Sequence, residues 1–183
     1  FDPRHCIRNV ERAVQNLGLD FLRHLMATTN LFRSWEEATI RKFGIREVLE
    51  HSVGGGALAE QSARTMTPED VAAEDARAAG LMHDVGKLVM INAYEDEYSL
   101  VWQRHRTSRI PLHVLEQEAF GVTHADIGGA LMILWGLPAH IVEAVEFHHR
   151  PQKTGLGSYN TVMSVHMADC MAHNRPGAEE TAE

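Results

Sequence analysis

The chain has 183 residues, a length typical of one domain, and 44% of them are hydrophobic, as in an ordinary globular protein. Its formal net charge of -8 argues against a nucleic-acid groove, because phosphate binding needs clustered Lys and Arg. We find no apolar run long enough to span a membrane and no signal peptide, and the unpatterned Cys6 and Cys170 favour a reducing compartment, so we expect a cytoplasmic protein. The chain begins at Phe1 rather than Met, so we expect it to be part of something longer.

Helix signals recur from one end of the chain to the other, whereas strand signals are scarce. Apolar residues repeat with a 3.6-residue period, and Gly, Pro and cap residues separate the periodic segments. The predicted helices cover residues 10–17, 19–32, 35–43, 47–64, 68–82, 94–102, 112–120, 124–135, 138–148 and 158–173. The expected fold is therefore all-α, a single bundle of about eight or more helices within residues 1–174. We expect the acidic tail at 175–183 to be disordered.

Three polar residues are predicted to start helices. Ser34 is a candidate N-cap for a helix from Trp35, with Glu37 three residues on as in a capping box. Thr67 precedes a proline and two acids, which is a strong helix start. Thr123 has the same character, with an acid at the third helical position.

A run of three glycines, 54–56, lies inside the predicted helix over 47–64. Each would weaken that helix by about 1 kcal/mol relative to Ala. A loop explains the run, and so does close packing of two helices next to His51; we favour the packing.

The adjacent pair His83-Asp84 is the strongest candidate for chemistry. Consecutive residues of a helix point about 100° apart, so the two can share a ligand only near a helix end or a bend, which Gly86 favours. The pair supplies an imidazole nitrogen and a carboxylate, donors suited to Zn, Fe or Mn, and the carboxylate can bridge two ions. Alone the dipeptide is weak evidence, because a solvated or helix-capping role explains most such pairs.

Other His and acidic residues strengthen this interpretation. Glu47 and His51 share one face of a predicted helix, and Asp169 lies on an apolar helix, where an unpaired carboxylate costs several kcal/mol. The full candidate set beside the pair is Glu47, His51, His124, His148, His149 and Asp169. Each has an ordinary alternative role, as a core histidine bonded to a carbonyl or a paired acid. Together they are the donors that a dinuclear centre in a helical bundle needs.

Several segments resemble HDOD domains, which belong to the HD superfamily and are related to the HD-GYP phosphodiesterases. The matching segments are AGLMHDVGKL at 79–88, EAFGVTHADIG at 118–128, WGLP at 135–138, FHH at 147–149, VHMAD at 165–169, LGLDFLR at 17–23 and HS at 51–52. They keep their order over residues 7–173, which makes the resemblance specific. It implies an all-α HD bundle, and also a small N-terminal lobe before residue 17, which we expect to be missing from this sequence.

The resemblance also implies a site. The positions that match metal ligands of the HD-GYP enzymes are His51, His83, Asp84, His124, His148, His149 and Asp169. Glu47 matches a carboxylate that some of those enzymes use for a third ion, and Lys87 matches the lysine that holds a substrate phosphate. Asp84 and Lys87 are the catalytic candidates. The implied cofactor is a divalent metal, as a dinuclear centre, with iron favoured over manganese or zinc.

Three functions remain open. After His149 the chain reads RPQKTGLGS, without the GYP loop, which argues against activity on cyclic di-GMP. The first hypothesis is a bacterial regulatory module that binds other signalling domains or proteins; the second is a metal-dependent phosphohydrolase acting on a nucleotide or other phosphoester. The third is a purely structural cluster. Six histidines match no motif and are predicted to be surface or hydrogen-bonded residues: His5, His24, His105, His113, His140 and His173. His166 is expected at most to support a ligand.

Overall fold

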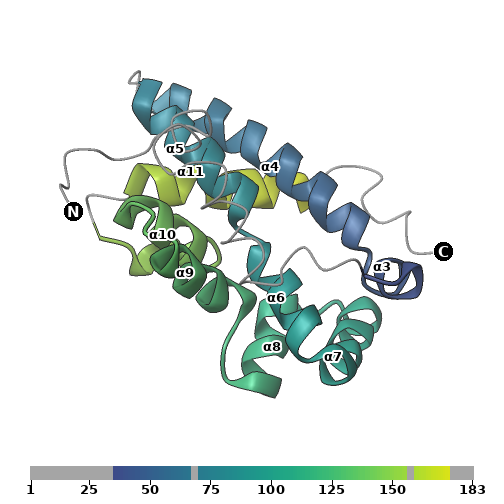
Figure 1. The fold of residues 1–183 in the computed structure, drawn as a ribbon. Coiled ribbons are helices and arrows are strands. Elements are labelled where there is room, and N and C mark those ends of the chain that lie inside the picture. The colour runs from purple at the N-terminus through teal and green to yellow at the C-terminus, as the bar shows by residue number, and fades with distance from the viewer. Residues whose placement is uncertain (1–34, 67–69, 156–158, 174–183) are drawn as a thin grey trace, which may run out of the picture.

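The computed structural model describes residues 35–66, 70–155 and 159–173, which form α-helices and one 3₁₀ turn and contain no strand (Figure 1). The elements are α3 (Glu37–Phe43), α4 (Ile45–Met66), α5 (Asp70–Met82), α6 (Val85–Ala93), α7 (Glu95–Ser108), α8 (Leu112–Phe120), α9 (His124–Leu134), α10 (Ala139–Phe147), the turn η1 (Pro151–Lys153) and α11 (Tyr159–His173). The all-α prediction is confirmed. The predicted helices over 10–17 and 19–32, the caps at Ser34 and Thr67, and the tail at 175–183 lie outside the described residues.

The helices form two connected groups. The long helix α4 packs along α5 and α11, and α10 closes this group by packing on α5 and α11 (Figure 1). At the other end, α7 packs on α8 and α6, with α3 beside it. The helices α6 and α9 pack on each other and join the two groups, because α6 follows α5 directly and α9 packs on α10.

Each group has its own core. Small side chains fill the space between α4, α5, α10 and α11, including Ala59, Ala76, Ala79, Val162 and Val165. The other core is aromatic and is built around Phe43 and Tyr98, whose ring centroids are 6.0 Å apart. The chain passes from the first core to the second at the junction of α5 and α6.

The glycine run on α4 brings that helix against α5. Gly56 lies over Leu81 and the carbonyl of Arg77, and a Cβ on Gly80 would lie 2.9 Å from the Cα of Gly56. Gly55 faces the ring of His83, the nearest atom of which would be 3.4 Å from an added Cβ. The packing interpretation is confirmed for Gly55 and Gly56, which place α4 directly against the end of α5, whereas an added Cβ on Gly54 would have nothing within 4 Å.

The predictions differ from the structure at three places: α6 was not predicted, the helix predicted to end at 102 continues to Ser108 in α7, and the start of α3 is displaced. The helix predicted from Trp35 begins at Glu37, and its N-cap Glu36 makes no side-chain capping hydrogen bond. By contrast, Thr123 caps α9 as predicted, in a capping box with Asp126. In the described part of the chain no helix is both long and apolar enough to cross a bilayer.

Candidate metal centre

His83 and Asp84 lie in the two-residue break between α5 and α6. Asp84 has φ -98° and ψ 2°, outside helical geometry, so the two side chains can turn toward the same space. Both side chains are buried. The predicted bend is therefore present, but Gly86 does not make it: Gly86 lies inside α6, where a Cβ would collide with the backbone carbonyl of His124. Its role is to let α6 approach α9.

Three buried histidines have one ring nitrogen fixed by an acceptor. The Nδ1–H of His83 donates to the carbonyl of Gly80 and that of His148 to the carbonyl of Val145, both at 2.7 Å. The Nδ1–H of His124 donates to the carboxylate of Glu116 at 2.6 Å. A neutral imidazole with its proton on Nδ1 presents a lone pair on Nε2, the form that binds a metal.

These Nε2 atoms converge on Asp84. Its Oδ2 lies 3.6 Å from Nε2 of His83, and its Oδ1 lies 3.4 Å from Nε2 of His124. Nε2 of His148 is buried and makes no hydrogen bond. A buried nitrogen without a partner is costly, so its aim toward this cluster indicates a missing ligand. One carboxylate oxygen faces each half of the cluster, as a bridging carboxylate requires.

Three further residues complete the cluster from neighbouring helices. His51 of α4 has its Nε2 3.2 Å from Nε2 of His83 and 3.1 Å from Oδ1 of Asp169. His149 has its Nε2 3.0 Å from Nε2 of His124, and its Nδ1 is 3.7 Å from Oδ2 of Asp169. The structure thus brings together the seven residues that the sequence predicts as metal ligands.

The charges of the cluster hold its carboxylates ionised. Burial alone would raise the pKa of Asp84, but the Lys87 ammonium at 2.6 Å and the surrounding imidazoles outweigh it and hold that pKa well below its usual value. The pKa of Asp169 is likewise lowered despite its burial, by hydrogen bonds from His173, His51 and His83. Burial lowers the pKa of His148 well below its usual value, and the nearby His83 and His124 lower it further. A neutral His148 beside ionised carboxylates is the protonation state of a metal ligand set.

The donor geometry fits two divalent ions. The groups that could each hold one ion within ligand distance are His51, His83 and Asp84 on one side, and His124, His148 and His149 on the other. Two imidazole nitrogens bound to one ion at about 2.0–2.1 Å lie about 3 Å apart, close to the 3.0 and 3.2 Å separations found here. Two lone pairs at such distances repel unless a proton or a cation lies between them.

Glu47 and Lys87 lie differently from the rest. Glu47 is exposed, and its carboxylate is directed to Gly44 at the start of α4 rather than to the cluster. Lys87 is buried, and its ammonium donates to Oδ2 of Asp84. The structure therefore brings Lys87 to the cluster and leaves Glu47 outside it.

Two residues of the site were not predicted from the sequence. Glu116 is fully buried and accepts hydrogen bonds from the backbone N–H and the ring of His124 and from the Tyr98 hydroxyl. The sequence feature that could have revealed Glu116 is the position of its carboxylate, four residues after Leu112 on the apolar side of a short helix. His173 lies with its Nδ1 3.1 Å from Oδ1 of Asp169, one turn earlier on α11. The spacing of four was a usable signal for that contact.

Two of the histidines predicted to be surface or hydrogen-bonded residues have a hydrogen-bonded role. His105 bonds the carbonyl of Ile110, and His140 pairs with the buried Asp75 at 2.7 Å. His166, predicted at most to support a ligand, bonds the carbonyl of His148. His113 instead stacks on the ring of His149, with centroids 4.1 Å apart. His5 and His24 lie outside the described residues.

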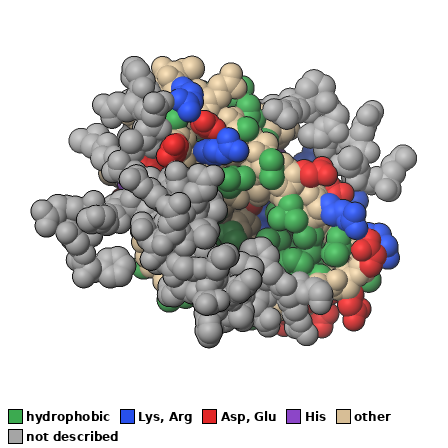
Figure 2. All heavy atoms as spheres, turned by 45° about the horizontal axis from the view of Figure 1, so that its top comes forward, with side chains coloured by type: hydrophobic (Ala, Val, Ile, Leu, Met, Phe, Trp, Pro, Cys, Tyr) green, Lys and Arg blue, Asp and Glu red, His purple; other side chains and the backbone are tan. Residues whose placement is uncertain are grey.

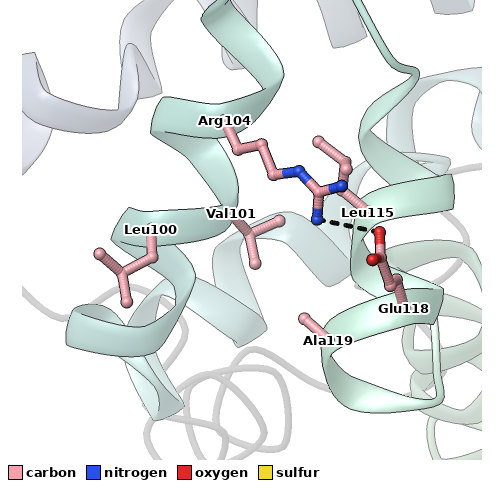
Figure 3. A pocket seen from close by; sticks show the side chains of 6 residues that line it. All are labelled: Leu100, Val101, Arg104, Leu115, Glu118 and Ala119. Carbon is pink, nitrogen blue, oxygen red and sulfur yellow. Dashed lines mark hydrogen bonds and ion pairs between the residues drawn. The ribbon is translucent and has the colours of Figure 1, made fainter. Parts of the chain in front are cut away.

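Two clefts open on the described surface. One, of about 180 Å³, is lined by His113, Val114, Gln117, Thr123, His149 and Arg150, and thus reaches one of the candidate ligands. A larger cavity, of about 280 Å³, lies between α7 and α8, where Arg104 pairs with Glu118 at 2.9 Å beside Val101 and Leu115 (Figure 3). The larger cavity is lined by none of the candidate ligands, whereas the smaller one is lined by His149.

Among the described residues on the face drawn in Figure 2, Lys and Arg side chains lie beside acidic and hydrophobic ones rather than in one cluster.

Comparison with protein families identifies the chain. The HDOD domain matches residues 1–151, most of its length. The chain belongs to the HDOD domain family. Among solved structures, an HDOD domain protein of unknown function from Geobacter sulfurreducens is 29% identical, with a TM-score of 0.65 over 91% of this chain and 55% of that one. The MmoQ response regulator of Methylococcus capsulatus strain Bath has a TM-score of 0.62 at 22% identity, over 98% of this chain and 72% of that one.

Two curated relatives share part of this HDOD domain. An uncharacterized protein of Treponema pallidum (strain Nichols) is 26% identical over 146 residues, which are 80% of this chain and 28% of that protein. Ribonuclease Y of Deinococcus radiodurans is 32% identical over 107 residues, which are 58% of this chain and 14% of that protein. The HDOD chain therefore spans less than a third of the length of either relative.

Proposed function

We propose that this HDOD domain is a regulatory module of a bacterial signalling protein and that it holds two divalent metal ions in its His/Asp centre. The observation that carries the metal proposal is the convergence of three buried Nε2 atoms, each on a ring whose Nδ1–H is fixed by an acceptor. Membership in the HDOD family and a fold shared with a response regulator support the regulatory role. Its partners would be other signalling domains or proteins in the cytoplasm.

The residues divide into two ligand sets that share Asp84. One ion would be held by His51, His83, Asp84 and Asp169, and the other by Asp84, His124, His148 and His149. Imidazole nitrogens and carboxylate oxygens suit iron, manganese and zinc, and we favour iron. Such an ion pair supplies Lewis acidity and an activated water. Glu116 orients His124, and Lys87 holds and partly neutralises Asp84.

Elemental analysis of protein purified without chelator tests the metal centre. We expect about two ions per wild-type chain and none in the His83→Ala/Asp84→Ala variant, because the variant loses the bridging carboxylate and one imidazole. His105→Ala is the matched control, since that histidine bonds a carbonyl away from the centre. Wild-type protein that stays metal-free after reconstitution with iron, manganese or zinc would contradict the proposal.

A metal-dependent phosphohydrolase is the second candidate. The cleft that reaches His149 favours it, because a phosphoester could approach the centre there. The 32% identity to a ribonuclease, over part of the chain, adds support.

A screen of metal-loaded protein against an aryl phosphodiester, nucleotides and short RNA separates the two candidates. If the domain is an enzyme, we expect turnover that His83→Ala abolishes. Protein with both ions bound and no turnover on any of these substrates leaves the regulatory role and contradicts the enzyme.

A further inference from the structure

A third group of potential metal ligands lies at the edge of the centre. It consists of His51, Asp169 and His173, which could hold one ion together. Oδ1 of Asp169 lies 3.1 Å from Nε2 of His51 and 3.1 Å from Nδ1 of His173, and the two rings have centroids 4.9 Å apart. His173 belongs to neither of the two buried ligand sets.

This outer group shares an atom with the buried centre. Nε2 of His51 lies 3.1 Å from Oδ1 of Asp169 and 3.2 Å from Nε2 of His83, and those two atoms are themselves 3.6 Å apart. An imidazole nitrogen has one lone pair and binds one ion at a time. The outer and inner positions are therefore alternatives for the same ion, rather than two sites filled together.

Exposure decreases from the outer group to the inner one. The side chain of His173 is 61% exposed, that of His51 19% and that of Asp169 9%. His83 and Asp84 are 1% and 2% exposed. An ion that reaches the buried pair from this side meets His173 first, then the two shared ligands.

The cleft beside His149 is less favourable for the entry of a cation. At the cleft beside His149 the charged groups are Arg150 and, paired with it, Asp126. A guanidinium repels a cation, and its partner carboxylate is already engaged. At the outer group the Asp169 carboxylate is also engaged, but its partners there are two imidazoles, which in their neutral form bind a cation as a guanidinium does not.

We propose that His51, Asp169 and His173 form a capture position at which a divalent ion binds first, before it moves to the ligands of the buried centre. This inference rests on the metal centre of the proposed function. It assigns to His173 a role in the rate of metal exchange and none in the final coordination.

Stopped-flow binding of cobalt(II), followed by its absorbance, tests the capture position in the metal-free protein. In His173→Ala we expect uptake at limiting cobalt to slow severalfold, because the ion loses the most exposed of the three ligands at which it would first bind. Release into excess chelator should slow by a similar factor, because uptake and release pass through the same position. The final stoichiometry should equal that of wild type.

Two variants serve as controls. Met171→Ala replaces an exposed neighbour on α11, and Glu47→Ala removes the exposed carboxylate one turn before His51. Both should exchange cobalt at the wild-type rate. Slow uptake in Glu47→Ala with normal uptake in His173→Ala would assign capture to Glu47 and overturn the proposal.

The remaining outcomes are also decisive. Wild-type rates in His173→Ala overturn the capture position and leave the buried centre intact. A lower stoichiometry or faster release in His173→Ala makes His173 a resident ligand, which also overturns the proposal. Wild-type protein that takes up no cobalt refutes the metal centre itself, so the two failures are distinguishable.

Discussion

Glu116 is the side chain on which the geometry of His124 depends. One of its oxygens accepts from both the backbone and the ring of His124, at 2.8 and 2.6 Å, and the other accepts from Tyr98 at 2.5 Å. Burial would raise the pKa of Glu116, but hydrogen bonds from His124 and Tyr98 and the nearby imidazole lower it overall. An ionised carboxylate behind a ligating imidazole raises the basicity of its far nitrogen.

Two substitutions of Glu116 distinguish the effect of its negative charge from the effect of its hydrogen bonds. In Glu116→Gln an amide oxygen can still accept from His124, so we expect folding stability near that of wild type and metal affinity about 10–100-fold lower. Competition with a chelating dye measures the affinity, and urea unfolding measures the stability.

Glu116→Ala has a different expected outcome. It leaves two buried N–H groups of His124 and the Tyr98 hydroxyl without an acceptor, and each unsatisfied group should cost about 1–3 kcal/mol of unfolding free energy. Metal affinity unchanged in Glu116→Gln would show that the carboxylate is there for packing alone.

Among the elements, the contact of α6 with α9 determines how the centre is assembled. Gly86 on α6 has no room for a Cβ against the carbonyl of His124, and Gly128 on α9 packs against Val145 of α10. This contact holds Asp84, at the start of α6, within 3.4 Å of His124, at the start of α9. The two residues face each other because the N-termini of α6 and α9 pack closely together.

Gly86→Ala should separate these helices. We expect a loss of about 1–3 kcal/mol in unfolding free energy, as for an overpacked interior, together with weaker metal binding. Gly54→Ala is the matched control, because an added Cβ there has nothing within 4 Å. That control should gain up to about 1 kcal/mol from helix propensity. Urea unfolding of both variants checks the pair; equal stabilities would contradict the close approach of α6 and α9.

Across the whole molecule, the sequence predicts the features that follow a helical period and those that depend on residues close together in the chain. The helical period predicts α4, α5 and α8–α11 to within a few residues, and the Thr123 cap is correct because its partner Asp126 is three residues away. The ligand candidates were found because a His-Asp pair and a resemblance marked them. The prediction of close packing at the glycine run was correct for Gly55 and Gly56 and wrong for Gly54, where an added Cβ has nothing within 4 Å.

The remaining features depend on contacts between distant segments. Nothing local in the sequence says that Gly86 meets His124, or that Glu116 is turned inward rather than to solvent. Glu47 shares a helix face with His51 by spacing, yet its carboxylate is directed to Gly44. Spacing determines on which face a residue lies, whereas the rotamer that its side chain adopts depends on the neighbours.

The distance along the chain between His51 and Asp169 has a consequence for synthesis. These two candidate ligands are 118 residues apart, and α4 packs along α11, the last helix described. During synthesis, α4 and the α5–α6 junction leave the ribosome long before α11. Until α11 emerges, the face of α4 that packs on it is exposed, and the ligand set is incomplete. Contacts of such high sequence separation form late in folding. Complete metal loading would therefore mark a chain synthesised through α11, and a product truncated before α11 would lack both a packing partner for α4 and one carboxylate of the proposed centre.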